Sequence, residues 1–333
     1  MNEEFACCAK KNEGYIPIEN YAVIGDCRCA ALISNTGSID WLCLPRFDGN
    51  AVFGAILDAE KGGCHRISPA CEYVARRRYI ENTNVLETNF STAAGEALLT
   101  DLMPVYDLDY MRSNLCPERH LLRKIQVLRG KLEINVRYKP RPDYGKVLPR
   151  LKDRGFYGLY YEMKEGALIY RSDSPMGLAP DGSEANESFV LEKGQKKYFS
   201  LVFSATGPAV LPMLGDEAES VIKRTVEWWK GWAGKCNYRG EYRKSVIRSL
   251  LALKLLAFSP SGAVIAAPTT SLPEKIGGIR NWDYRFCWLR DAAMTIRAFF
   301  KLGYKKEAEA FLAWLLHSTR LSRPRLDRKS TRL

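Results

Sequence analysis

The sequence lacks the marks of several common classes of protein. It contains neither a GxxxxGK(S/T) nor a GxGxxG loop, the glycine-rich motifs that bind nucleotide phosphates. It has no apolar run of about 20 residues that could cross a bilayer, and it does not begin with a basic stretch followed by an apolar one, as a secretory signal does. We therefore expect a cytoplasmic protein that does not associate with a membrane.

Metal ligands are also scarce. Only three histidines are present, and the close cysteine pairs, Cys7 with Cys8 and Cys27 with Cys29, lack the two-residue spacer of a zinc knuckle. The ten cysteines are spread over a long chain without an export signal, which favours reduced thiols over a disulfide framework. We expect no metal ion and no organic cofactor.

The net charge of +12 does not indicate a nucleic-acid partner. The last fifteen residues hold six basic residues and one acidic residue, so much of the excess lies at one end. Clustered Lys and Arg attract phosphates, but no nucleic-acid-binding motif accompanies them here. Residues 321–333 show no helical period, and we expect them to be a tail that is foreign to the fold.

With 333 residues and 46% apolar content, the chain is long enough for two domains. Up to about residue 212, β-branched and aromatic runs are broken by Gly, Pro, Asn and Asp, a pattern typical of an antiparallel β-sandwich. The expected strands are residues 29–34, 38–44, 84–92, 96–103, 124–128, 132–138, 167–170, 188–191 and 197–204. Beyond residue 212, apolar residues recur every three or four positions, which predicts helices. The expected helices are residues 217–232, 242–258, 289–302 and 305–317.

These patterns predict a multidomain chain, β first and α second. Its parts are an N-terminal extension over 1–14, a β-sandwich domain over 15–212, a linker helix within 213–240, and the start of an all-α domain over 241–320.

The densest group of functional side chains lies at an expected loop-to-helix junction. Trp282, Tyr284 and Trp288 are interleaved there with arginine and aspartate, and the stretch ends in Arg290 and Asp291. Sugars present apolar C–H faces that stack on aromatic rings, and hydroxyls that bond to guanidinium and carboxylate groups. The composition therefore suits a sugar site. A packed domain junction, with aromatic rings in its core and paired charges, accounts for the same residue types.

A resemblance to a known family is carried by the stretch GGIRNWDYRFCWLRD at 277–291. It closely resembles the start of the catalytic domain in bacterial and archaeal glycoside hydrolase family 15, which includes glucoamylases, glucodextranases and some trehalases. The runs YAVIGD at 21–26 and GSIDWLCLPRFD at 37–48 resemble the opening of the trehalase-like β-domain of the same proteins. Weaker matches are NVLET at 84–88 and PDYG at 142–145.

The resemblance implies a β-supersandwich followed by a six-hairpin α/α toroid with the active site in its mouth. Trp288, Arg290 and Asp291 would line the subsite for the non-reducing glucose, and the last two would bind its 4- and 6-hydroxyls. Neighbouring residues of a regular helix diverge by about 100°. Both side chains therefore reach one sugar only if they lie where the helix begins.

The resemblance also implies an inverting reaction on an α-glucoside oligosaccharide or trehalose. Such enzymes use two carboxyl groups ~6.5–9.5 Å apart, one as acid and one as base. The family's two glutamates belong to later segments, and Glu274 and Glu307 match neither motif. We therefore expect a truncated toroid without catalytic residues, in which Glu274 and Glu307 are ordinary surface residues. The alternative is a non-catalytic carbohydrate-binding or structural β-module; the oligomeric state is not indicated.

Two weaker candidates lie in the β-domain. Trp41 and Arg46 could reach over the mouth of the toroid and shape the substrate pocket, although aromatic residues near strand ends more often pack between sheets. We expect the short basic run 76–78 to form a solvated face.

Overall fold

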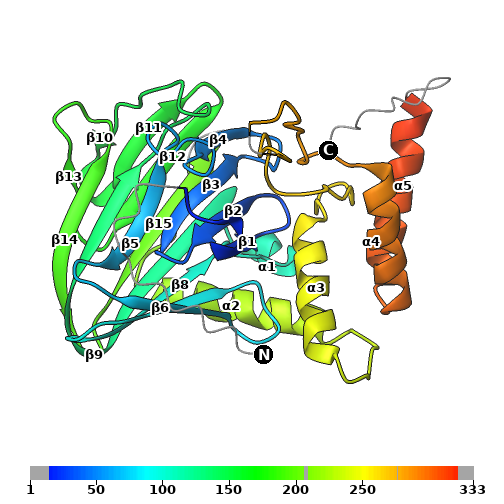
Figure 1. The fold of residues 1–333 in the computed structure, drawn as a ribbon, viewed down its shortest axis with the longest axis horizontal. Coiled ribbons are helices and arrows are strands. Elements are labelled where there is room, and N and C mark those ends of the chain that lie inside the picture. Colours follow the sequence, from blue (N-terminus) through cyan, green and yellow to red (C-terminus); the bar gives the residue numbers. More distant parts are fainter. Residues whose placement is uncertain (1–14, 206–208, 276, 322–333) are drawn as a thin grey trace.

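The structure is a computed structural model that describes residues 15–205, 209–275 and 277–321. They form a β-sandwich followed by helices, as the sequence predicts (Figure 1). The expected extension over 1–14 and nearly all of the expected tail over 321–333 lie outside the described residues. The domain boundaries drawn from the sequence stay a prediction.

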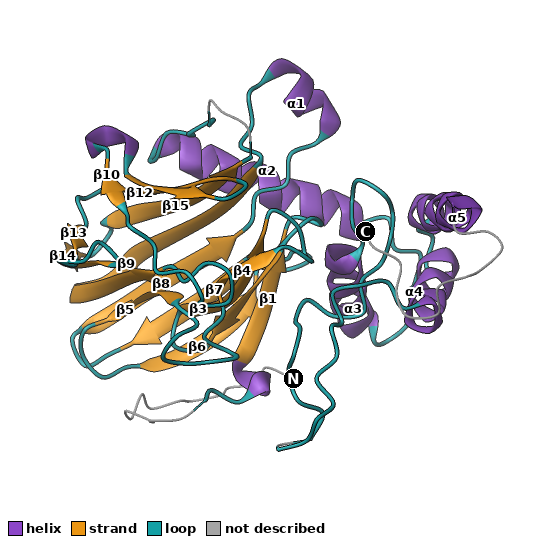
Figure 2. Cartoon of the chain, turned by 90° about the horizontal axis from the view of Figure 1, so that it is seen from above, coloured by secondary structure: helices purple, strands orange, loops and turns teal. Residues whose placement is uncertain are grey.

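Two antiparallel sheets form the sandwich (Figure 2). The strands in the described part of the chain are β1 (Tyr21–Gly25), β2 (Ala30–Ser34), β3 (Ser38–Leu44), β4 (Asn50–Phe53), β5 (Cys64–Pro69), β6 (Val74–Tyr79), β7 (Leu86–Ser91), β8 (Gly95–Leu102), β9 (Arg119–Lys139), β10 (Lys152–Asp153), β11 (Leu159–Met163), β12 (Gly166–Ser172), β13 (Gly177–Leu178), β14 (Ala185–Glu192) and β15 (Lys196–Ser204). The first sheet has the order β6-β7-β8-β9-β15-β12-β11-β10. The second has the order β1-β2-β3-β5-β9-β14-β13, with β4 paired to β3.

Strand β9 belongs to both sheets. Two separate strands were expected here, over 124–128 and 132–138, and that expectation is wrong because the chain does not reverse between them. Gly130 has a φ of +77°, a conformation that glycine adopts without steric cost. Before this kink β9 pairs with β8 and β15, and after it with β5 and β14.

The long helices match the sequence pattern closely. They are α2 (Asp216–Ala233), α3 (Arg243–Leu256), α4 (Leu289–Lys301) and α5 (Lys305–Leu321), and a short helix, α1 (Leu108–Ser113), was not expected. Val221 and Trp229 of α2 are buried in one cluster with Leu122 of β9, so α2 covers the outer face of the first sheet. Helix α3 reaches β1, where a Cβ added to Gly25 would lie 2.9 Å from Leu255.

Glu307 of α5 is not the surface residue that we expected. Its side chain is 15% exposed, accepts a hydrogen bond from Nε1 of Trp232 at 2.7 Å and lies 3.2 Å from Nζ of Lys254. These contacts fasten α5 to α2 and α3. The basic run in β6 is also only partly solvated, because Arg77 is half-buried and donates to the carbonyl of Ile33 at 3.1 Å.

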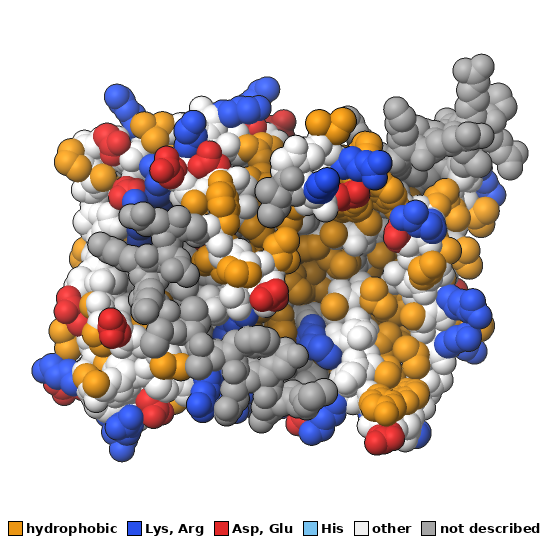
Figure 3. Space-filling view, viewed as in Figure 1, with side chains coloured by type: hydrophobic (Ala, Val, Ile, Leu, Met, Phe, Trp, Pro, Cys, Tyr) orange, Lys and Arg blue, Asp and Glu red, His pale blue; other side chains and the backbone are white. Residues whose placement is uncertain are grey.

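Helices α4 and α5 leave an apolar surface exposed. Met294 and Phe300 of α4 and Leu312 and Leu316 of α5 are each more than half exposed. Figure 3 shows apolar side chains gathered over this end of the molecule and in the hollow between the helices and the sandwich. Large apolar patches on a soluble protein usually mark a contact with another element or partner.

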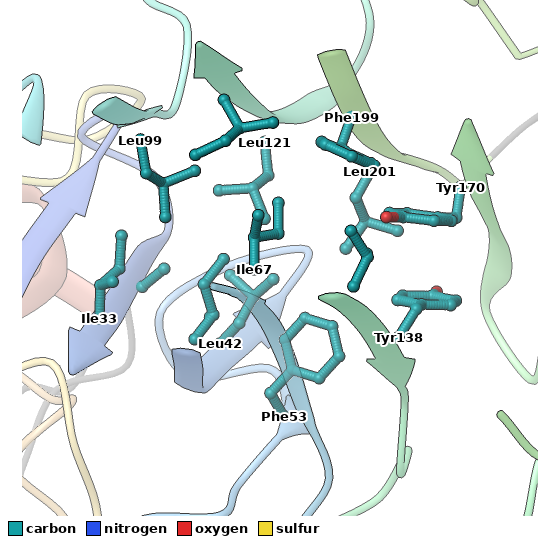
Figure 4. Close-up of a cluster of buried hydrophobic side chains, with 14 of the residues drawn as sticks. Ile33, Leu42, Phe53, Ile67, Leu99, Leu121, Tyr138, Tyr170, Phe199 and Leu201 are labelled. Atoms are coloured by element: carbon teal, nitrogen blue, oxygen red, sulfur yellow. The ribbon is translucent and has the colours of Figure 1, made fainter. Parts of the chain in front are cut away.

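The main core lies between the two sheets (Figure 4). Leu42 and Ile67 of the second sheet meet Leu99, Phe199 and other side chains of the first, all of them fully buried. A buried ion pair lies nearby. Arg123 is fully buried and pairs with the equally buried Asp101 at 2.7 Å.

Candidate functional site

The junction between α3 and α4 is a loose hairpin that leads into α4. The nitrogen of Ala267 donates to the carbonyl of Tyr284 at 2.9 Å, and the nitrogen of Ser271 donates to Trp282 at 3.1 Å. An antiparallel bridge joins Thr270 and Asp283. The second arm of the hairpin is therefore extended, and its side chains alternate between two faces.

One face of this arm carries the predicted aromatic residues. The rings of Tyr284 and Trp288 stack, with centroids 5.3 Å apart and planes at 23°, and Trp282 is about half exposed. The hydroxyl of Tyr284 donates to Glu274 at 2.7 Å, a contact that the sequence analysis missed. Nε1 of Trp288 is buried and has no acceptor among the described residues, whereas native structures satisfy most such groups.

Arg290 and Asp291 lie in the first turn of α4, directly after Trp288. The guanidinium of Arg290 lies 6.0 Å from the centroid of the Trp288 ring and 3.3 Å from the carboxylate of Asp291, with the two side chains 73% and 41% exposed. Such an exposed ion pair contributes only ~0–1 kcal/mol to stability. Of the five predicted residues, Tyr284, Trp288, Arg290 and Asp291 therefore gather at the start of α4; no described side-chain contact joins Trp282 to them.

The opposite face of the arm is fastened to the β-domain by Arg285. Its guanidinium forms a bidentate pair with Asp283, at 3.0 and 2.8 Å. It also crosses to the segment after β3, where it donates to the carbonyl of Gly49 at 2.7 Å and to Phe47 at 3.4 Å. Arg285 is buried and was not among the predicted site residues. In an extended segment the side chains of Tyr284 and Arg285 face opposite ways, and this alternation is the signal that could have identified it.

The surroundings of Arg285 determine whether its guanidinium is charged. Burial is the largest single influence and lowers the pKa of Arg285, but the hydrogen bonds to Asp283 and the ionisable groups of Cys43, Tyr144 and Asp283 together raise that pKa above its usual value. The guanidinium therefore stays charged. Burial raises the pKa of the neighbouring Cys43 thiol to about 12, although Arg285 opposes the shift. Cys43 is therefore a neutral packing residue at physiological pH.

The two weaker candidates lie on the same side as Arg285. Trp41 is fully buried, and its Nε1 donates to the carbonyl of Pro268 in the first arm at 2.7 Å. Arg46 is 43% exposed and pairs with Asp48 at 2.9 Å. The β-domain thus contacts both arms of the hairpin: Trp41 donates to Pro268 of the first arm, and the segment after β3 accepts from Arg285 of the second.

We expect Arg285→Lys to destabilise the protein by about 1–3 kcal/mol, because lysine keeps the charge but loses the fork that reaches Asp283 and Gly49 together. Thermal unfolding would show a fall of a few degrees in Tm. Arg280→Lys, an exposed arginine of the same hairpin, is the matched control and should leave Tm unchanged. An unchanged Tm for Arg285→Lys would contradict the anchoring role.

Residues 15–205, 209–275 and 277–321 contain no cluster of three His, Cys, Asp or Glu side chains placed to hold a metal ion. Over the same residues, no helix is both long and apolar enough to cross a membrane.

Comparison with known proteins gives two family matches. Residues 11–213 match the model of the trehalase-like N-terminal domain, and residues 240–325 match that of glycosyl hydrolases family 15. A trehalase of Thermoplasma volcanium is 37% identical over 304 residues, which cover 90% of this chain and 47% of that protein. A trehalase of Mycolicibacterium smegmatis is 33% identical over 317 residues, with shares of 90% and 47%. The chain therefore spans about half the length of these curated relatives.

Among solved structures, a putative kojibiose phosphorylase from the human microbiome aligns with 88% of this chain and 45% of its own, with a TM-score of 0.42 and 8% identity.

Proposed function

Because this chain belongs to glycosyl hydrolases family 15, in the form with a trehalase-like N-terminal domain, we propose that it is the N-terminal half of an inverting α-glucoside hydrolase. Its substrate is trehalose, the disaccharide named by its relatives. The observation that carries the proposal is the group Tyr284, Trp288, Arg290 and Asp291, which presents stacked rings, a guanidinium and a carboxylate at the start of α4.

In this proposal each side chain of the group has a separate task. The paired rings of Tyr284 and Trp288 offer an apolar surface for one face of a glucose ring. Arg290 donates to sugar hydroxyls and Asp291 accepts from them. Both belong to the first turn of α4; neighbouring helical residues diverge by about 100°, but the charged ends of these two side chains meet at 3.3 Å, so they can bind the same sugar.

The remainder of the α/α toroid is supplied by later segments. The exposed apolar surface of α4 and α5 supports this proposal of further helices, because a completed ring of helices would cover Phe300, Leu312 and Leu316. The buried Nε1 of Trp288 is a second indication, since an acceptor from a later segment or from the sugar would satisfy it. In this proposal the two carboxyl groups of the inverting reaction also belong to the later segments of the toroid.

The product anomers of the complete protein test the reaction. Inverting hydrolysis of trehalose attacks one anomeric carbon and releases the other sugar unchanged, so we expect equal initial amounts of β- and α-glucose by NMR. Exclusive release of α-glucose would indicate retention and contradict the mechanism. Maltose and isomaltose, assayed in parallel, test the substrate; a higher kcat/KM on either would contradict trehalose.

We expect the 333-residue chain by itself not to turn over trehalose. Loss of an acid or base from such a reaction costs roughly 10²–10⁴-fold in rate, and both groups belong to later segments in this proposal. The measurement is glucose release by the purified chain beside the complete protein at equal concentration. Equal rates would show that the catalytic carboxylates lie within the chain.

A further inference from the structure

An open groove of about 550 Å³ lies on the outer face of the first sheet, at the end of the sandwich away from α4 and α5 (Figure 1). Its floor comes from β11 and β12, where Tyr160 is the register partner of Ile169 and Glu162 the partner of Ala167. The alternate side chains of these strands, such as Tyr161 and Leu168, face the core. The groove residues are therefore directed outward.

The rim of the groove carries aromatic and charged side chains from the two adjoining turns. Tyr157, from the turn before β11, is 64% exposed, and Arg154 of the same turn lies 6.0 Å from the centroid of the Tyr160 ring. Lys164 lines the groove from the turn after β11. The groove thus combines an exposed ring with hydrogen-bond donors at its rim and an acceptor, Glu162, on its floor.

We infer that this groove binds a neutral oligosaccharide, at a site separate from the one at the start of α4. The exposed ring of Tyr157 suits the C–H face of a hexose, and the volume of the groove lies within the ~300–1,000 Å³ of ligand pockets. Arg154, Lys164 and Glu162 offer both signs of charge. A polyanion would select for an excess of basic groups, whereas sugar hydroxyls use donors and acceptors together.

Isothermal titration with maltoheptaose as the probe tests the inference. The 333-residue chain with Arg290→Ala is used, so that the site at the start of α4 does not contribute. We expect saturable binding with a Kd of about 1 mM or tighter. Tyr157→Ala, at an exposed position that tolerates truncation, should weaken it at least tenfold, and Glu162→Ala should weaken it severalfold.

The matched control is Tyr242→Ala, because Tyr242 is 67% exposed and lies before α3, outside the groove. It should leave the Kd unchanged. Absence of saturable binding would overturn the inference, as would binding that neither Tyr157→Ala nor Glu162→Ala weakens. The inference does not depend on the proposed hydrolysis, since the titration needs no turnover.

Discussion

Replacing Asp101 by alanine should destabilise the protein by about 3–5 kcal/mol, the largest stability loss expected of the substitutions considered. The carboxylate and Arg123 are both fully buried and lie 2.7 Å apart. Alanine would leave the guanidinium charged without a counter-ion and out of reach of water. The free energy of unfolding, from urea denaturation of the wild type and the variant, measures the loss.

Arg123 has a second role that the double variant would reveal. It donates to the carbonyls of His65 at 2.6 Å and Gly37 at 2.8 Å; His65 lies in β5 of the second sheet and Gly37 in the turn between β2 and β3. Asp101→Leu with Arg123→Met removes both charges, but it leaves the two carbonyls without their donor, so we expect only partial recovery of stability. Full recovery would show that the arginine only neutralises the carboxylate.

The control for this pair lies on the same long strand. Lys131 of β9 and Glu192 of β14 are register partners whose side chains lie 2.9 Å apart, but both are more than 60% exposed. Glu192→Ala should therefore change the free energy of unfolding by no more than about 1 kcal/mol. A loss as large as that of Asp101→Ala would show that burial does not decide the cost.

The local sequence pattern predicts where helices and strands lie better than it predicts which strands pair with one another. The turn at 35–37 between β2 and β3 and the limits of α2 and α4 follow from glycine placement and helical period. The kink at Gly130 carries the same sequence signal as a hairpin turn, yet the chain there moves from one sheet to the other. Only the pairing of distant strands distinguishes the two outcomes, and one sequence does not contain that information.

The candidate site shows the same limit for charged residues. The sequence places three arginines between residues 280 and 290, at the entry to α4, but it does not reveal that Arg285 is buried against the β-domain while Arg280 and Arg290 face solvent. Arg123 is a similar case, since its position within β9 resembles an ordinary exposed one. A buried arginine is identified by the acceptors around it, and these come from segments far away in the chain.

Asp291→Asn and Arg290→Ala should each lower kcat/KM of the complete enzyme on trehalose by roughly ten- to several-hundred-fold while leaving Tm nearly unchanged. A hydrogen bond to a charged group contributes about 1.5–3 kcal/mol, and loss of such a contact in the transition state appears directly in kcat/KM. The two residues do pair with each other, at 3.3 Å, but on an exposed surface, where the pair adds ~0–1 kcal/mol to stability.

The decisive comparison is kinetic loss against thermal loss in the same variants. Arg297→Ala is the matched control, because Arg297 is an exposed arginine of the same helix two turns further on, and it should change neither quantity. A structural ion pair predicts the reverse pattern from a binding role: breaking it lowers Tm by several degrees and leaves the kinetics of the folded fraction unaltered. That outcome for Asp291→Asn would rule out a sugar-binding role for Asp291, and with it the reason for placing the substrate at the start of α4.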